Sequence, residues 1–483
     1  MNNKNISKNL FWKLLERFGF SGIQFILQIV LARLLEPELY GVLSIMIIFT
    51  TLANVFIQNG FNTALIQNKD VSEEDYSSVF WVSLVIAIIL YGVIFFCAPL
   101  IGMFYSIPYI VRPLRVLALI LFPGSLNSIQ LAKISREMDF KKVFYSNIGG
   151  VIVSGIVGII IAYKGGGLWA LVAQTLLNIV IVCIVMQFTT KLKICFVCNL
   201  QRVKVLFAYG WKLLVSSLLD TLYQDLRSLV IGKKYNSQTL GYYNRGKQFP
   251  QFIINAVNGA VQSVMLPAMS AEQDNKLRVK DMMRTSITMS AYIIFPMMAG
   301  LAAVSDSLVR IILTEKWLPC VPYMQIYCFI FAFYPIHTCN LQAINSMGRS
   351  DIFLKLEIIK KFVGLCALIV AVFCFESPIA IALTGVFTGL VSCFINAYPN
   401  KRLINYSYLQ QFKDLVPSII MSIAMYFIVV LISKIKMNAL LILILQVLIG
   451  IVTYLVISII FKPPTYKMLI KQIKNKRTIN HAK

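Results

Sequence analysis

The sequence is poor in charged residues. Only 13% of its 483 residues are Asp, Glu, Lys or Arg, about half of the roughly 25% that soluble globular proteins carry. Hydrophobic residues make up 58% of the chain. This composition excludes a soluble enzyme, a disordered chain and a nucleic-acid-binding domain, so no nucleic-acid partner is expected. It predicts an integral membrane protein that crosses the bilayer many times.

Acidic residues are scarcer still, with 20 Asp and Glu against 45 Lys and Arg. The net charge of +25 is interpreted as membrane topology, because basic residues gather in the cytoplasmic loops of membrane proteins. The ten cysteines mostly lie in apolar runs and lack the spacing of a secreted disulfide scaffold. No small-residue cleavage site follows the basic start of the chain, so no removable signal peptide is predicted.

Fourteen apolar stretches are long enough to cross a bilayer as helices, which need about 20 residues each. Basic residues concentrate on the inner side when the N-terminus is cytoplasmic and the spans alternate, which predicts that both termini are cytoplasmic. The fold class is therefore an all-α polytopic membrane protein. The predicted spans lie near residues 11–35, 39–59, 78–104, 113–132, 143–163, 167–188, 206–231, 240–267, 282–303, 320–345, 352–374, 378–398, 412–433 and 438–461.

The two halves of the chain resemble each other. Trp12-Lys-Leu-Leu15 recurs as Trp211-Lys-Leu-Leu214, and Tyr40-Gly41 has a partner in Gly241-Tyr242. Such repeats are typical of transporters, whose substrate site lies between the repeats. The predicted domains are an N-terminal six-helix bundle (1–188), a basic cytoplasmic linker (189–205), a C-terminal six-helix bundle (206–398), an additional helix pair (399–461) and a basic cytoplasmic tail (462–483).

Polar side chains inside the predicted spans mark the candidate site, because a charge at the bilayer centre costs about 2.5–3.5 kcal/mol on insertion scales. In span 206–231, polar residues at helical spacing share one face; they are Lys212, Ser216, Asp220, Gln224 and Arg227. Span 240–267 carries a stripe of amides from Asn244 to Gln262. A water-filled cavity lined by amides and cations suits a sugar that bears an anionic group.

Structural interpretations of the same residues stay open. Cations near span ends could extend to lipid headgroups. Asp220 and Asp225 could pair with Arg227 or Lys212, and the amide stripe could hydrogen-bond neighbouring helices. The glycine run after Lys164 lacks the Lys-Ser/Thr of a phosphate-binding loop, so it is predicted to be a turn and no ATP site is expected. His337 is predicted to be a packed helix residue, and the pair Cys195 and Cys198 to bind no metal.

Several segments along nearly the whole chain carry a family resemblance. They are Leu31–Gly41, Ala64–Gln67, Glu73–Tyr76 with Val79–Trp81, Met138–Lys142, Leu229–Gly232, Leu240–Tyr243, Glu315–Pro319, Gly348–Asp351 and Leu356–Lys361. With fourteen spans as two sets of six and a final pair, the chain resembles the Wzx-type polysaccharide flippases of the multidrug/oligosaccharidyl-lipid/polysaccharide exporter superfamily.

The resemblance implies a transporter, not an enzyme, that moves an undecaprenyl-diphosphate-linked oligosaccharide across the bacterial inner membrane by alternating access. It implies no cofactor, with H⁺ or Na⁺ as candidate coupling ion at Asp220 and Asp225, since burial can shift the pKa of a carboxyl group. The polymerase and ligase of the same glycan pathway are candidate partners, besides membrane lipids. The candidate substrate-binding residues are Arg17, Arg115, Lys212, Arg227, Arg245, Lys247, Gln248, Gln251 and Asn255.

Other functions compete with this one. A multidrug antiporter of the same superfamily carries mostly cationic substrates and calls for an acid-rich cavity, whereas bases outnumber acids in these spans. A lipid II flippase would be essential for growth. A membrane-embedded glycosyltransferase or polymerase usually needs a long external loop or an acidic pair. A purely structural scaffold gives no reason for charges within spans.

Overall fold

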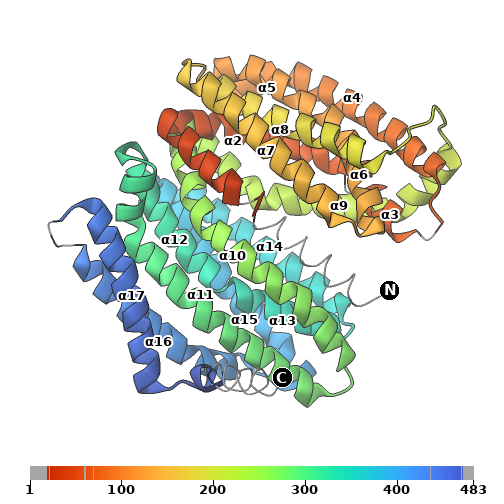
Figure 1. Ribbon diagram of the computed structural model, residues 1–483. Helices are drawn as coiled ribbons and strands as arrows, with labels where there is room; N and C mark the ends of the chain where they lie inside the picture. Colours follow the sequence, from red (N-terminus) through yellow and green to blue (C-terminus); the bar gives the residue numbers. More distant parts are fainter. Residues whose placement is uncertain are drawn as a thin grey trace, which may run out of the picture. The chain divides into compact units, whose positions relative to one another are not determined.

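The structure, a computed structural model, describes residues 19–470 except for 21, 59, 60, 69, 434, 436 and 469. No β-strand occurs in these ranges, and a short apolar helix at Gly22–Leu34 comes first. The elements that follow are α2 (Pro37–Gln58), α3 (Phe61–Gln67), α4 (Glu73–Tyr105), η1 (Pro108–Ile110), α5 (Val111–Leu117), η2 (Ala118–Ile120), α6 (Leu121–Glu137), α7 (Phe140–Tyr163), α8 (Leu168–Thr190), α9 (Leu200–Lys234), α10 (Ser237–Ala271), α11 (Lys276–Ile312), η3 (Glu315–Cys320), α12 (Val321–Ala332), α13 (Tyr334–Ser346), α14 (Ser350–Cys374), α15 (Pro378–Ile404), α16 (Tyr408–Ile432) and α17 (Ala439–Phe461) (Figure 1).

Within the described ranges, 11 helical segments are long and apolar enough to cross a membrane, and α9 would make 12 if its two bent parts form one span. Every predicted span from 39–59 onward falls on a helical segment, which confirms the all-α membrane architecture. The number fourteen stays a prediction, because residues 11–18 and 21 of span 11–35 lie outside the described residues, and the described helix at Gly22–Leu34 is too short to cross a membrane by itself. Helix α14 does not qualify, since Glu357, Lys360 and Lys361 interrupt its apolar run.

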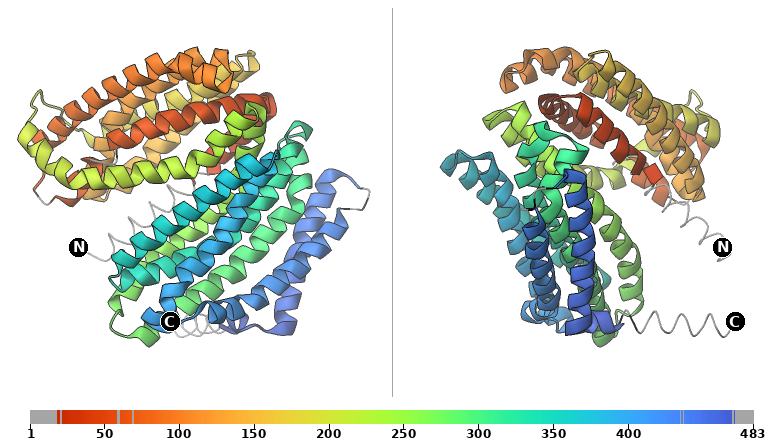
Figure 2. Two further views of the ribbon diagram at one scale, coloured as in Figure 1. Left: turned by 180° about the vertical axis from the view of Figure 1, so that it is seen from behind. Right: turned by 60° about the vertical axis from the view of Figure 1, so that its left-hand side comes forward.

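The chain divides into two compact units, Met1–Gly241 and Tyr242–Lys483. In the first unit, α7 packs along α8, while α9 lies against α2, α3 and α4. In the second, α11 packs against α12, α16 and α17, and α14 packs against α15. Figure 2 shows these helices side by side within each unit. The predicted boundaries at 188, 205, 398 and 461 are not tested by this division and stay predictions.

Local sequence explains where helices begin and turn. Helix α4 starts with a capping box, in which Ser72 and Asp75 each bond the other's backbone amide. Between α7 and α8, Gly165 and Gly167 adopt positive φ angles of 75° and 52°, which only glycine accepts at little cost. This confirms the turn that the sequence predicts after Lys164.

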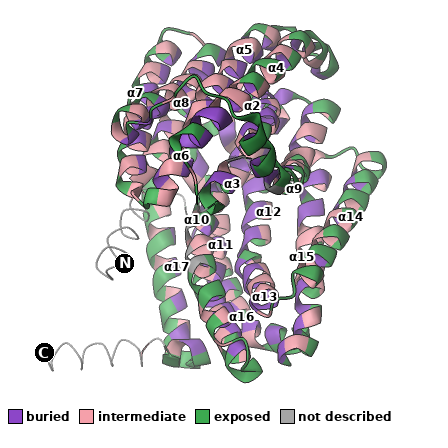
Figure 3. Cartoon of the chain, turned by 90° about the vertical axis from the view of Figure 1, so that its right-hand side faces the viewer, coloured by how far each residue is buried: buried purple, intermediate pink, exposed green. Residues whose placement is uncertain are grey.

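Large apolar side chains remain exposed along the long helices. On α14, Phe362 and Phe373 are 67% and 82% exposed, and on α4, Phe96 is 78% exposed. Figure 3 shows how exposed and buried residues alternate around the helices. Such apolar outer faces are what spanning helices present to lipid, with every backbone hydrogen bond satisfied inside the helix.

A buried amide network joins α13, α15 and α16 in the second unit. Asn340 donates from Nδ2 to Oε1 of Gln411 at 2.9 Å, and it accepts at Oδ1 from Asn400 at 2.8 Å and from Gln411 at 3.1 Å. All three side chains are at most 3% exposed. The network therefore attaches α16 to the helices before it. Nearby, the half-buried His337 lies against Asn396, as a packed helix residue should.

The substitution Asn340→Ala removes these interhelical bonds and leaves buried amides without partners. We expect it to destabilise the second unit by about 1–3 kcal/mol, measured as a lower unfolding temperature of the purified protein in detergent. Asn345→Ala on the same helix is the matched control, because the Asn345 side chain makes no hydrogen bond within the described residues. Equal effects of the two substitutions would show that the network does not stabilise the protein.

Candidate functional site

Helix α9 presents its predicted polar face outward from the first unit. Lys212, Ser216, Asp220 and Gln224 are all exposed, whereas Arg227, one turn further on, is half-buried. Another side of α9 packs inward, with Leu214 and Ser228 buried, whereas the apolar Trp211 and Leu219 remain exposed. Asp225 is half-buried and lies off this line of side chains. The helix is thus amphipathic in the manner that its spacing predicts, with charge and amide groups on one side.

Helix α10 holds the other predicted cations, within the second unit. Arg245 is only 4% exposed, and its Nη1 donates to Oε1 of Gln248 at 2.6 Å. Its guanidinium carbon lies 5.0 Å from the centre of the Trp317 ring. Lys247 lies 5.9 Å from the ring of Tyr327. Cation–π contacts of this kind favour a charged group at a place where water is scarce.

An aromatic cluster around Arg245 was not predicted. Tyr243 stacks edge-on against Tyr323 and Tyr327, and its hydroxyl hydrogen-bonds that of Tyr327. Helix α10 lies very close to the end of η3 here: a Cβ at Gly246 would lie 2.7 Å from the carbonyl oxygen of Cys320. Two segments that carry the family resemblance each contribute an aromatic residue here, Tyr243 from Leu240–Tyr243 and Trp317 from Glu315–Pro319. Their pairing needed the structure.

Some amides of the α10 stripe pack against neighbouring side chains, and others are exposed. Asn258 accepts a hydrogen bond from Thr338 on α13 at 2.5 Å, so this amide joins two helices. Gln248 is held by Arg245, Gln251 is half-buried and Asn255 is exposed. The middle of the stripe therefore keeps amides at accessible positions.

The remaining predicted residues lie apart from these helices in the chain. Arg115, on α5 of the first unit, donates from Nε to the carbonyl oxygen of Phe95 at 3.1 Å and stacks over its ring at 4.0 Å. Arg17 lies outside the described residues. The structure groups Arg115 with the α9 residues in the first unit, and Arg245 through Asn255 in the second.

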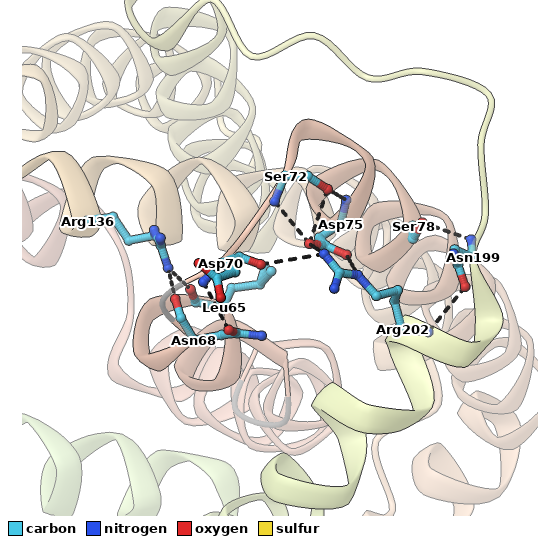
Figure 4. Close-up of polar contacts among 9 residues, drawn as sticks. All are labelled: Leu65, Asn68, Asp70, Ser72, Asp75, Ser78, Arg136, Asn199 and Arg202. Atoms are coloured by element: carbon cyan, nitrogen blue, oxygen red, sulfur yellow. Dashed lines mark hydrogen bonds and ion pairs between the residues drawn. The ribbon is translucent and has the colours of Figure 1, made fainter.

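The predicted linker is pinned to the first unit by an ion pair (Figure 4). Arg202 donates from Nε and Nη2 to the two carboxylate oxygens of Asp75, both at 2.9 Å. The Asp75 side chain is 4% exposed and that of Arg202 is 50% exposed. Because Asp75 also caps α4, one carboxylate stabilises both the helix start and the linker.

Two serines of α4 hold the linker backbone beside this ion pair. The backbone amide of Cys195 donates to Ser77 Oγ at 3.0 Å, and that of Asn199 donates to Ser78 Oγ at 2.9 Å. Trp81 donates to the carbonyl oxygen of Cys195 and stacks on Phe196. We call Asp75, Ser77, Ser78 and Arg202 the linker clamp. The segments Glu73–Tyr76 and Val79–Trp81 carried part of the family resemblance, but the sequence assigned them no partner.

Comparison with known proteins identifies the family. A family model described as polysaccharide biosynthesis protein matches residues 30–322. The chain belongs to this family. It is 23% identical to the succinoglycan biosynthesis transport protein ExoT of Rhizobium meliloti, over 66% of this chain and 64% of that protein. It is 24% identical to the teichuronic acid biosynthesis protein TuaB of Bacillus subtilis, over 63% of each chain.

A third relative, the lipopolysaccharide biosynthesis protein WzxC of Escherichia coli, is 20% identical over 74% of this chain and 73% of its own. The match covers just under two thirds of the length of ExoT and TuaB. These matches confirm the resemblance that the sequence segments carried.

Solved structures confirm the fold. The lipid II flippase MurJ in its inward closed conformation superposes with a TM-score of 0.75 at 17% identity, covering 95% of this chain and all of that one. An inward-facing multidrug resistance transporter of the MATE family gives a TM-score of 0.62 at 14% identity, over 82% of this chain and 99% of that one. The chain is a multi-pass membrane protein with the fold of these transporters.

Proposed function

We propose that the chain is a flippase that moves an undecaprenyl-diphosphate-linked oligosaccharide across the membrane by alternating access, for synthesis of a surface polysaccharide. Membership of the polysaccharide biosynthesis family and the flippase fold support this proposal. The observation that carries it is the polar face of α9, where Lys212, Asp220 and Gln224 are exposed on an otherwise apolar helical protein. Such a face offers an amphiphilic head group both cations and amides.

The proposed roles follow from side-chain chemistry. The cations are assigned to the diphosphate and to acidic sugars, because guanidinium and ammonium groups form charge-assisted hydrogen bonds to phosphate and carboxylate. The amides of α10 are assigned to sugar hydroxyls, to which they both donate and accept. Asp220 and Asp225 are assigned to H⁺ or Na⁺ coupling. The cations are Arg17, Arg115, Lys212, Arg227, Arg245 and Lys247, and the amides are Gln248, Gln251 and Asn255.

The proposal includes placement in the bacterial inner membrane with both termini in the cytoplasm. The distribution of basic residues supports this orientation. The polymerase and ligase of the same glycan pathway would then receive the flipped unit on the outer side, so they are the proposed partners.

Deletion of the gene tests the proposed function. Loss of one surface glycan, with accumulation of its lipid-linked repeat unit at the inner leaflet, is the expected result. Composition analysis of the lost glycan would identify the substrate in the same experiment. Unchanged glycan with altered sensitivity to cationic drugs would instead assign the protein to the antiporters of its superfamily.

The substitution Lys212→Gln tests the α9 face. Loss of one charge-assisted hydrogen bond of about 1.5–3 kcal/mol should lower flipping of the lipid-linked unit at limiting substrate about tenfold or more in proteoliposomes. Lys204→Gln, an exposed lysine on the same helix outside the predicted span, is the matched control and should flip normally. Normal flipping by both variants would exclude Lys212 from substrate binding.

A further inference from the structure

A cavity of about 650 Å³ opens in the first unit, where η1 and α5 meet the starts of α2 and α8. Its lining combines arginine with aromatic and aliphatic side chains; it includes Leu39, Tyr109, Arg112, Arg115, Leu168 and Trp169. The volume falls in the range of about 300–1,000 Å³ that is usual for small-molecule sites. The cavity is formed entirely by residues of one unit, so it does not depend on how the two units are placed.

The charge of the cavity is positive. Arg112 and Arg115 lie three positions apart on α5 and therefore share a face of the helix. Within the described ranges Arg112 makes no ion pair or hydrogen bond, and Arg115 makes one hydrogen bond, from Nε to the Phe95 carbonyl. The neighbouring acid, Glu38, accepts a hydrogen bond from the Tyr109 hydroxyl at 2.6 Å. Two guanidinium groups thus line the cavity without a carboxylate beside them in its lining.

Aromatic surface completes the lining. Trp169 is 43% exposed and Tyr109 is 48% exposed, so both rings are accessible. An aromatic face binds apolar surface such as the C–H face of a sugar ring, while the indole N–H and phenol O–H stay polar. Guanidinium groups bind carboxylate and phosphate through paired N–H donors. A ligand that satisfies both halves of the lining has a sugar ring and an attached anion.

We infer that this cavity is a binding site for an anionic saccharide, with the sugar ring against Trp169 and its carboxylate or phosphate bound by Arg112 and Arg115. The inference rests on the proposed function, which brings such a head group to the protein. In the proposed orientation the cavity opens on the outer side of the membrane. There it would hold the head group after crossing, separately from the polar faces of α9 and α10.

The test uses the full chain in nanodiscs of phosphatidylcholine, whose headgroup carries no net charge. Glucuronic acid, glucose 1-phosphate and neutral methyl glucoside are titrated while ligand-observed NMR measures binding. We expect the two anionic sugars to bind at least about tenfold more tightly than the glucoside, with Arg112→Gln weakening them about tenfold, as loss of one charge-assisted bond predicts. Lys164→Gln removes an exposed cation at the turn before α8, outside the lining, and should change nothing.

Two results would overturn the inference. Equal binding by the wild type and Arg112→Gln would place any sugar site elsewhere; this variant alters an exposed side chain and should fold. Equal binding of glycerol 1-phosphate and glucose 1-phosphate, unaffected by Trp169→Ala, would identify a site for phospholipid headgroups. Because the assay measures binding alone, either result leaves the gene-deletion test of flipping intact. Failure of the deletion test would remove the proposed function whatever the cavity binds.

Discussion

The substitution Gly41→Val should prevent correct folding of the first unit. A Cβ at Gly41 would overlap the backbone carbonyl oxygen of Ser237, in the first turn of α10. A backbone carbonyl cannot rotate away as a side chain can, so α2 and this turn would have to separate. Overpacking in a well-packed core costs about 1–3 kcal/mol and occasionally more, and we expect a cost at the upper end or beyond. The measurement is the yield of monodisperse protein in detergent and its unfolding temperature.

We call the close contact between α2 and the first turn of α10 the crossing, and it predicts a reciprocal result. A Cβ at Gly241 would overlap the carbonyl oxygen of Pro37, so Gly241→Val should have a similar effect. Gly92→Val on α4 is the matched control, because no atom lies within 4 Å of a Cβ at that position, while the change in helix propensity from glycine to valine is the same at both sites. If the control variant loses as much folded protein as Gly41→Val, the loss does not come from the close contact between α2 and the first turn of α10.

This crossing gives a physical reason for part of the repeat in the sequence. Tyr40-Gly41 and Gly241-Tyr242 were matched as short, separately weak similarities. In the structure each glycine lies against the residue four positions before the other, Pro37 or Ser237. Glycine is needed at both places because two backbones approach too closely for any side chain. Self-similarity located the pair, but only coordinates show that its members touch.

Hydrophobic run length predicted the helices well, because each spanning helix must satisfy its backbone within itself. It predicted interruptions less well. The predicted span 113–132 contains the 3₁₀ turn η2 at Ala118–Ile120, and the predicted span 320–345 is divided between α12 and α13 at Phe333. Pro335, in the first turn of α13, lacks the N–H that would continue the helix before it. Hydropathy does not register such breaks, since both flanking segments are apolar.

The sequence likewise predicted one part of the candidate site and missed another. Helical spacing predicted the exposed face that Lys212 and Asp220 share, because spacing along one helix fixes which side chains are neighbours. It did not predict that Trp317 lies over Arg245, or that Trp169 and Arg112 line one cavity, because these pairs come from elements distant in sequence. Periodicity tells which side of a helix is polar, not what lies opposite.

Substitutions in the linker clamp should strongly destabilise the attachment of the linker to the first unit. Arg202→Gln leaves the carboxylate of Asp75 nearly buried without its cation, and Asp75→Asn removes the charge and weakens the cap of α4. Each should destabilise the pinned linker by about 1–3 kcal/mol. Local opening would then rise roughly tenfold or more, since about 1.4 kcal/mol corresponds to a factor of ten. Trypsin cleavage after the exposed Lys191 and Lys193 measures that opening.

A double substitution separates the ion pair from its surroundings. If Asp75 and Arg202 act through each other, the effects of the two substitutions should not add. The Asp75→Asn/Arg202→Gln protein should then be cleaved clearly more slowly than the sum of the two single effects predicts. Arg349→Gln breaks a pair of similar geometry, but both Arg349 and Asp351 are about half exposed, so solvent screening should leave stability almost unchanged. Full additivity at the clamp would mean that Arg202 holds the linker through other contacts, such as the carbonyl of Asp70. The contrast between the two pairs follows from burial, because the same two charges attract strongly only where water cannot replace them.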